Sequence, residues 1–110
     1  MDINTTQYKN CDLVKVSGRV DSLTAPQLAE VLKSITDSSR FAIVLDLENV
    51  TYASSAGLRV MIDTQKTCKP HRGEVVLACV PQRVYETLDL AGLVVLFRFF
   101  DNITTAIGNI

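Results

Sequence analysis

Several residue types that mark particular classes of protein are scarce or missing in this chain of 110 residues. It has no tryptophan, one histidine, three prolines and five glycines. The glycines are dispersed, so the sequence lacks a Gly-rich loop of the kind that cradles phosphates in nucleotide-binding proteins. A single histidine leaves no good Ser-His-Asp set for nucleophilic catalysis. We therefore expect no intrinsic enzymatic activity.

Cysteine is also rare, and its positions argue against a metal centre. Cys11, Cys68 and Cys79 are far apart and form no Cys-x-x-Cys pair. Zinc sites typically draw on closely spaced ligands, and His71 has only Cys68 near it in the sequence. The sequence thus predicts no metal ligands and no cofactor. It favours free thiols, buried or partly buried, in the reducing environment of the cytoplasm.

The chain also has no large excess of positive or negative charge and no long apolar run. The formal net charge is -1, and Lys and Arg form no dense run, so we expect no direct contact with nucleic acid. The most apolar tract, residues 93–100, is interrupted by Arg98 and is far shorter than the roughly 20 residues that span a bilayer. Residues 1–6 lack the basic and apolar parts of a signal peptide. These features predict a cytoplasmic protein without a membrane span.

The residues that are present alternate between strand and helix patterns. With 47% hydrophobic residues, the chain is long enough for one domain over residues 1–110. We expect strands at 3–8, 13–20, 41–47, 75–80 and 94–100. Helices are expected from Thr24, from Ser54 or Ser55 to about residue 69, from Pro81 to about Gly92, and after a cap at Asp101.

This order predicts the fold class. Strands that alternate with helices favour crossover connections and parallel pairing, whereas the first two strands are joined by a short turn and form a hairpin. We therefore expect an α/β protein with a mixed β-sheet, an antiparallel N-terminal edge hairpin and helices packed against the sheet. Asp46 and Glu48 are expected to mark the point where the third strand emerges into solvent.

The most informative segment is Phe41–Ile62, in which a buried strand leads through small residues into a helix. Between them lies the sequence Ala-Ser-Ser-Ala-Gly, residues 53–57. Either Ser54 or Ser55 can cap the helix, and a plain N-cap is the simplest interpretation. The free N–H groups at a helix start would also stabilise a phosphate on the serine.

The arrangement LDLENVTYASSAGLRVM resembles the signature of the STAS family, specifically its stand-alone bacterial anti-sigma factor antagonists. That signature is a strand, then Asp-Ser-x-Gly-Leu, then a helix. Residues 18–21, Gly-Arg-Val-Asp, followed by Thr24 and Ala25, are similar to the Gly-x-x-Asp turn of the family. Residues 73–77 and 88–93 resemble its fourth strand and the end of its third helix. The resemblance spans nearly the whole chain and implies a single STAS domain.

The resemblance also implies a function. In the family, the unphosphorylated antagonist binds an anti-sigma factor that is a serine kinase, and so frees a sigma factor. The kinase ends this interaction by phosphorylating the signature serine, and a PP2C-type serine phosphatase restores it. The motif match makes Ser55 the phosphate acceptor. Ser54 stands where the family usually has aspartate, and it is the alternative acceptor.

Residues near this serine are candidates for contact with the partner. They are Asp21, Ser22, Thr24, Ser54, Ser55, Gly57 and Arg59. For Asp21 and Thr24 the alternative is a purely local role in a turn and cap, and Arg59 is alternatively an ordinary exposed helix residue. Two other functions remain open for the whole chain: a STAS scaffold or ligand-sensing module that is never phosphorylated, and a STAS domain of an anion transporter, which the missing membrane span disfavours.

Overall fold

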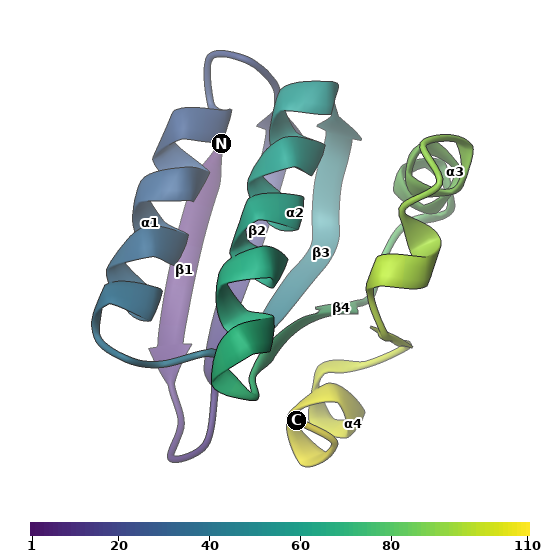
Figure 1. The fold of residues 1–110 in the computed structure, drawn as a ribbon. Helices are drawn as coiled ribbons and strands as arrows, with labels where there is room; N and C mark the ends of the chain where they lie inside the picture. Colours follow the sequence, from purple (N-terminus) through teal and green to yellow (C-terminus); the bar gives the residue numbers. More distant parts are fainter.

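The computed structural model describes residues 1–110, and its centre is a five-stranded sheet in the order β1-β2-β3-β4-β5. The sheet is mixed: β1 pairs antiparallel with β2, and all other pairs are parallel (Figure 1). The prediction of a mixed α/β sheet with an antiparallel edge hairpin is thus confirmed. The elements are β1 Asp2–Gln7, β2 Asp12–Val20, α1 Ala25–Asp37, β3 Ala42–Ala53, α2 Ser55–Cys68, β4 Glu74–Ala78, α3 Gln82–Leu90, β5 Phe99–Phe100 and α4 Ile103–Gly108, with short 3-10 helices η1 Lys69–His71 and η2 Val94–Leu96.

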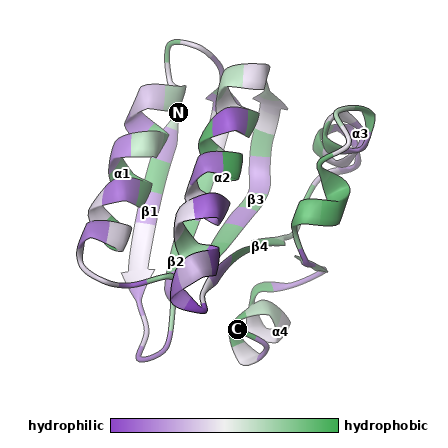
Figure 2. Ribbon diagram, in the orientation of Figure 1, coloured by the Kyte–Doolittle hydropathy of each residue, from purple (hydrophilic) through white to green (hydrophobic).

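The two faces of the sheet are covered by different helices. Because successive residues of a strand point to opposite faces, the sheet contributes to two separate apolar clusters. The larger cluster joins one face to α1, α2 and α3, and it contains Leu28, Leu58 and Leu88 from these helices. The smaller joins the other face to α4 through Val44 and Ala106. Figure 2 shows the apolar residues of α1 and α2 alternating with polar ones, as expected for helices with one buried side.

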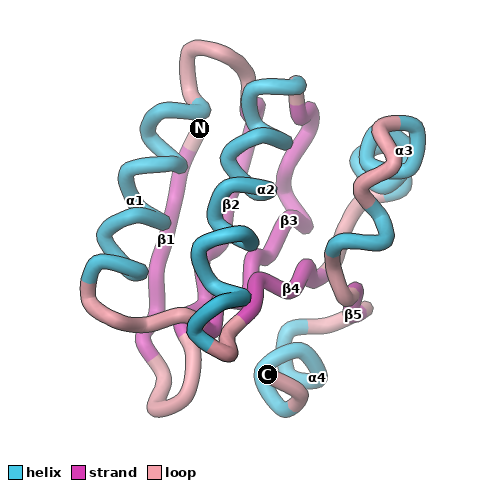
Figure 3. Tube along the Cα trace, in the orientation of Figure 1, coloured by secondary structure: helices cyan, strands magenta, loops and turns pink.

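Two helices begin at the same edge of the sheet. β2 and β3 are parallel neighbours, so their carboxyl ends lie together, with Val20 opposite Ala53. The connections to α1 and α2 start there and are adjacent in Figure 3. The backbone N–H of Ser54 donates to the carbonyl of Val20 at 2.8 Å, which ties the start of α2 to the end of β2.

The prediction of a strand over residues 94–100 was wrong for most of its length. Only Phe99 and Phe100 pair with β4, while residues 94–96 form η2. The backbone groups of Leu96 bond to partners outside the sheet. Its N–H donates to the carbonyl of Leu93 at 3.0 Å, and its carbonyl accepts from the side-chain amide of Gln65 at 2.8 Å. Gln65 is buried in α2 and competes with strand pairing for this segment.

Other expectations need smaller corrections. β3 runs on to Ala53, and Asp46 is fully buried instead of emerging into solvent, because its side chain lies on the face of the sheet that α4 partly covers. Asn102, and not Asp101, caps α4, accepting from the N–H of Thr105 at 2.8 Å. No helix in the chain is both long enough and apolar enough to cross a membrane.

Candidate functional site

The candidate site is built around the start of α2, where Ser54 is the N-cap. Its backbone is extended, with φ -84° and ψ 173°, as is usual for a residue that precedes the first helical turn. The hydroxyl accepts from the N–H of Gly57 at 3.4 Å, and the carbonyl accepts from the N–H of Leu58 at 3.0 Å. Ser54 is only partly exposed. Of the two serines, Ser54 is therefore the one that holds the helix start together.

Ser55 is the first residue of α2 and has a different environment. Its side chain is exposed, and its hydroxyl makes no hydrogen bond within the protein. The first turn contains no acidic side chain, so the positive end of the helix dipole is not neutralised by a carboxylate of the same turn. This hydroxyl is accessible from solvent and lies where a negative charge is favoured.

Gly57 explains how α2 can start so close to the sheet. The residue is buried, and a Cβ at this position would lie 2.6 Å from Cγ1 of Val20 and 3.3 Å from the carbonyl oxygen of Val20. Only a residue without a side chain fits against β2 at this distance. We predicted Gly57 as a contact residue, and the structure places it beneath the surface, where it positions Ser54 and Ser55.

The loop between β2 and α1 forms the adjacent part of the site, and its polar groups bond to one another. Oδ1 of Asp21 accepts from the N–H groups of Leu23 at 3.0 Å and Thr24 at 3.1 Å. In return, Oγ1 of Thr24 accepts from the N–H of Asp21 at 2.9 Å. Hydrogen bonds, above all from the N–H of Thr24, hold the pKa of Asp21 below its usual range. Thr24 occupies the N-cap position as expected, but its hydroxyl closes this loop and does not bond to a helix N–H group.

The same loop exposes an apolar side chain that the sequence analysis missed. Leu23 is 89% exposed, between Ser22, which is also exposed, and the start of α1. Close by on the strand ends, the guanidinium of Arg19 lies 4.4 Å from the centre of the Tyr52 ring. The signal that could have identified Leu23 is its position in a turn between two polar residues, outside the apolar spacing of α1.

A groove runs from Ser55 along the outer side of α2. Its volume is about 340 Å³, and it lies between α2 and the segment that follows α3. Arg59 stands one turn after Ser55; it is exposed and makes no ion pair. The residues that line the groove are Ser55, Leu58, Arg59, Ile62, Asp63, Lys66, Ala91 and Leu93. Of the predicted residues, Ser55 and Arg59 thus line this groove. Ser54 joins the start of α2 to the end of β2 through Val20, directly before the loop that carries Asp21, Ser22 and Thr24.

Comparison with known proteins agrees with this description. The model of the STAS domain family matches residues 2–106. An anti-sigma-B factor antagonist of Staphylococcus aureus is 32% identical over 93 residues, which cover 84% of this chain and 86% of the relative.

Solved structures share the fold at lower sequence identity. An anti-sigma factor antagonist from Mycobacterium paratuberculosis has a TM-score of 0.87 at 23% identity, covering 97% of this chain and 91% of the other. The Bacillus protein SpoIIAA matches in its unphosphorylated form with a TM-score of 0.83 at 14% identity, covering 96% and 93% of the two chains. SpoIIAA has also been solved in a phosphorylated form, which matches with a TM-score of 0.78.

Proposed function

This chain belongs to the STAS domain family, and we propose that it is an anti-sigma factor antagonist whose binding is switched by phosphorylation of Ser55. In the unphosphorylated state it binds an anti-sigma factor that is a serine kinase, and a sigma factor is released. The kinase transfers the phosphate from ATP to the Ser55 hydroxyl and thereby ends the complex. A PP2C-type serine phosphatase removes the phosphate again.

The observation that carries this proposal is the division of roles between the two serines. The Ser54 hydroxyl accepts a hydrogen bond from Gly57 and caps α2, so its modification would disturb the helix start. Ser55 is exposed, and its hydroxyl is free of hydrogen bonds within the protein. A kinase can therefore reach Ser55 without opening any contact of the fold. This favours Ser55 over Ser54 as the acceptor.

A phosphate on Ser55 would change the surface without unfolding it. It adds about -1.5 to -2 charges, which the positive end of α2 stabilises. Arg59 is four residues further along the same helix face, and long side chains on a helix point back toward its N-terminus, so its guanidinium can approach the phosphate. The partner would then meet a charged group where it previously packed on a small hydroxyl. Repulsion and desolvation both weaken the complex.

The second candidate function is a STAS scaffold or ligand-sensing module that is never phosphorylated. It is favoured by Ser54, a neutral capping residue where the resembled signature carries aspartate. In that case both hydroxyls serve only the helix start, and the surface around Ser55 binds its partner permanently. The two functions differ in whether phosphate is ever transferred to this chain.

The decisive experiment incubates the protein with its cognate kinase and ATP and measures the intact mass. We expect one added phosphate on the wild type and none on Ser55→Ala. Ser54→Ala is the matched control, because it removes the neighbouring hydroxyl and leaves the acceptor in place; it should still be labelled. Phosphate that persists in Ser55→Ala and disappears in Ser54→Ala would identify Ser54 as the acceptor. No added phosphate on the wild type, with the kinase active on another substrate, would favour the scaffold.

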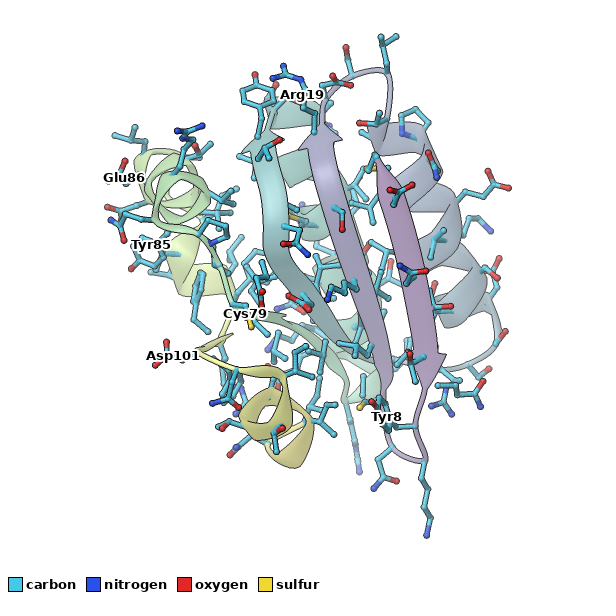
Figure 4. The ribbon with its side chains drawn as sticks, turned by 180° about the vertical axis from the view of Figure 1, so that it is seen from behind. Tyr8, Arg19, Cys79, Tyr85, Glu86 and Asp101 are labelled. Carbon is cyan, nitrogen blue, oxygen red and sulfur yellow. The ribbon has the colours of Figure 1, made fainter.

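A binding experiment tests the proposed contact surface. We expect Leu23→Asp to weaken the complex with the anti-sigma factor at least tenfold. The variant replaces an apolar side chain that is 89% exposed with a charged one, in the loop that follows Val20, the residue to which the backbone of Ser54 is hydrogen-bonded. The control is Tyr8→Asp, in the turn at the opposite end of the sheet (Figure 4), which should bind like the wild type. Equal affinities for both variants would exclude this loop from the interface.

A further inference from the structure

The most unusual buried group in the protein is the carboxylate of Asp46 on β3. The residue is fully buried, and its Oδ1 accepts from the N–H of Glu48 at 3.0 Å. Its Oδ2 is buried without any hydrogen-bond partner. Buried polar atoms in proteins nearly always have a partner, and a bound water or ion is one explanation of an exception. Asp46 is the only side chain in the chain with such an atom.

Two further potential ligands surround this carboxylate. Glu48 lies two residues along β3 and therefore on the same face of the sheet. Cys79 directly follows Ala78, the residue of β4 that is paired with Asp46. One ligand atom from each of Asp46, Glu48 and Cys79 lies within 4.8 Å of the others. Figure 4 shows Cys79 near α4 on the face of the sheet seen from behind, with Asp101 on the neighbouring segment.

We propose that Asp46, Glu48 and Cys79 bind one divalent thiophilic cation, Zn²⁺, with water in the remaining coordination position. Carboxylate oxygens bind zinc at about 2.0–2.2 Å and thiolates at about 2.3 Å, so the three side chains must move together slightly. Glu48 is exposed and Cys79 is only half-buried, so both can move, whereas Asp46 is held in place. The thiolate selects zinc over Mg²⁺ and Ca²⁺, which prefer oxygen ligands throughout.

Carboxylates outnumber cationic side chains around Cys79. Burial, Asp46 and Glu48 raise the pKa of the Cys79 thiol, and Asp101 adds to this effect, whereas Lys15 lowers it. Lys15 lies opposite Asp46 on β2, yet its ammonium forms no ion pair with either carboxylate. The thiol is within 3.5 Å of the Asp101 carbonyl, the only acceptor of its proton. On binding, the cation replaces this proton, which is released to solvent.

The site departs from the expectation that this chain holds no metal. That expectation rested on the distance between the cysteines and the histidine in the sequence. The parallel pairing of β3 with β4 brings Cys79 to Asp46, although a helix and a strand separate them along the chain. The site is on the α4 side of the sheet, whereas Ser55 begins the helix that packs on the other side. The two sites can therefore be tested separately.

The test titrates the reduced, chelator-treated full chain with Co²⁺, a spectroscopic substitute for Zn²⁺, and then with Zn²⁺ in a calorimeter. We expect one equivalent of Co²⁺ to produce a thiolate charge-transfer band in the near ultraviolet. The band should be absent in Cys79→Ser. Cys11→Ala is the matched control. Cys11 is a free thiol like Cys79 and lies next to an aspartate, Asp12, but that aspartate is paired with Arg40. This control should keep the band.

The carboxylates are tested by Asp46→Asn and Glu48→Gln, each expected to weaken Zn²⁺ binding at least tenfold. Glu48 is exposed, so its variant folds even if a change at the buried Asp46 does not. Circular dichroism confirms folding of each variant. The proposal is overturned if no 1:1 band forms, if the band survives in Cys79→Ser, or if Glu48→Gln binds Zn²⁺ as tightly as the wild type. Loss of metal binding in Cys11→Ala would also overturn it, because the metal would then depend on a thiol outside the proposed site.

Discussion

The helices α1 and α2 begin at the same edge of the sheet, directly after the parallel strands β2 and β3, but they use their polar side chains differently. Before α1, Asp21 and Thr24 bond to each other and to the loop backbone, so the polar groups serve the fold. Before α2, Ser54 alone performs the capping, and the hydroxyl of Ser55 next to it stays free. The start of α2 thus presents a free hydroxyl to a partner, whereas the polar side chains of Asp21 and Thr24 before α1 are engaged within their loop.

The difference shows how a modifiable residue can be placed at a helix start at little structural cost. A side chain at the N-cap can accept hydrogen bonds from the free N–H groups of the first helical turn, whereas a side chain at the first helical position is not needed for this. Because Ser54 is the cap, the hydroxyl of Ser55 is free to accept a phosphate. Four substitutions at the two helix starts test this comparison through the free energy of unfolding.

The largest effect is expected for Gly57→Ala. The new methyl group would lie 2.6 Å from Cγ1 of Val20, which is buried and, as a β-branched side chain, cannot rotate away easily. Overpacking costs about 1–3 kcal/mol, more than the gain of about 0.5–1 kcal/mol from replacing glycine in a helix. Urea denaturation measures the change. The double variant Val20→Ala/Gly57→Ala should lose less than the sum of the single variants, and strict additivity would show that the two side chains do not collide.

The second effect concerns the cap of α2. Ser54→Ala removes the acceptor for the N–H of Gly57, and loss of a serine cap typically costs about 1 kcal/mol. The observed contact is long, 3.4 Å, so we expect the lower part of the usual range. The same denaturation experiment measures it. A stability equal to that of the wild type would mean that Ser54 is not the cap and would remove the argument that separates it from Ser55.

A smaller effect is expected at the start of α1, from Asp21→Asn. The pKa of Asp21 is lowered in the folded protein, so its stabilising contribution is present above the pKa of the unfolded chain and is lost as pH falls through the folded pKa. The group is close to solvent, which screens its interactions. Wild type should therefore exceed Asp21→Asn in Tm at pH 7, and the difference should shrink below about pH 4. A Tm difference that does not change with pH would show that the negative charge of Asp21 does not contribute to stability.

The smallest effect is expected for Ser55→Ala. The hydroxyl makes no contact within the fold, and exposed substitutions of this kind usually change stability by less than about 0.5 kcal/mol. Thermal and urea unfolding should both match the wild type. A loss as large as that of Ser54→Ala would show that Ser55 shares the capping role, and the contrast between the two serines would disappear.

Much of the fold could be predicted because the relevant signals are local. The strand expected at 13–20 and the helix expected from Thr24 are present as β2 and α1, and the small residues after Tyr52 do mark the start of α2. The segment at residues 94–100 could not be predicted, because its apolar composition suits a strand. Gln65, distant in sequence, instead donates to the Leu96 carbonyl, and its side-chain oxygen accepts from the N–H of Val75. A buried polar residue of α2 therefore decides the structure of a segment that looks like a strand.

By itself, the sequence determined the order of strands and helices, the antiparallel edge hairpin and the position of two serines at a helix start, because these follow from local periodicity and turn chemistry. Only the tertiary structure decided which serine caps α2, because that depends on how closely Gly57 packs on Val20. It also decided that Asp46 is buried beside Cys79. Register between β3 and β4 places these residues together, and register is a property of the assembled sheet.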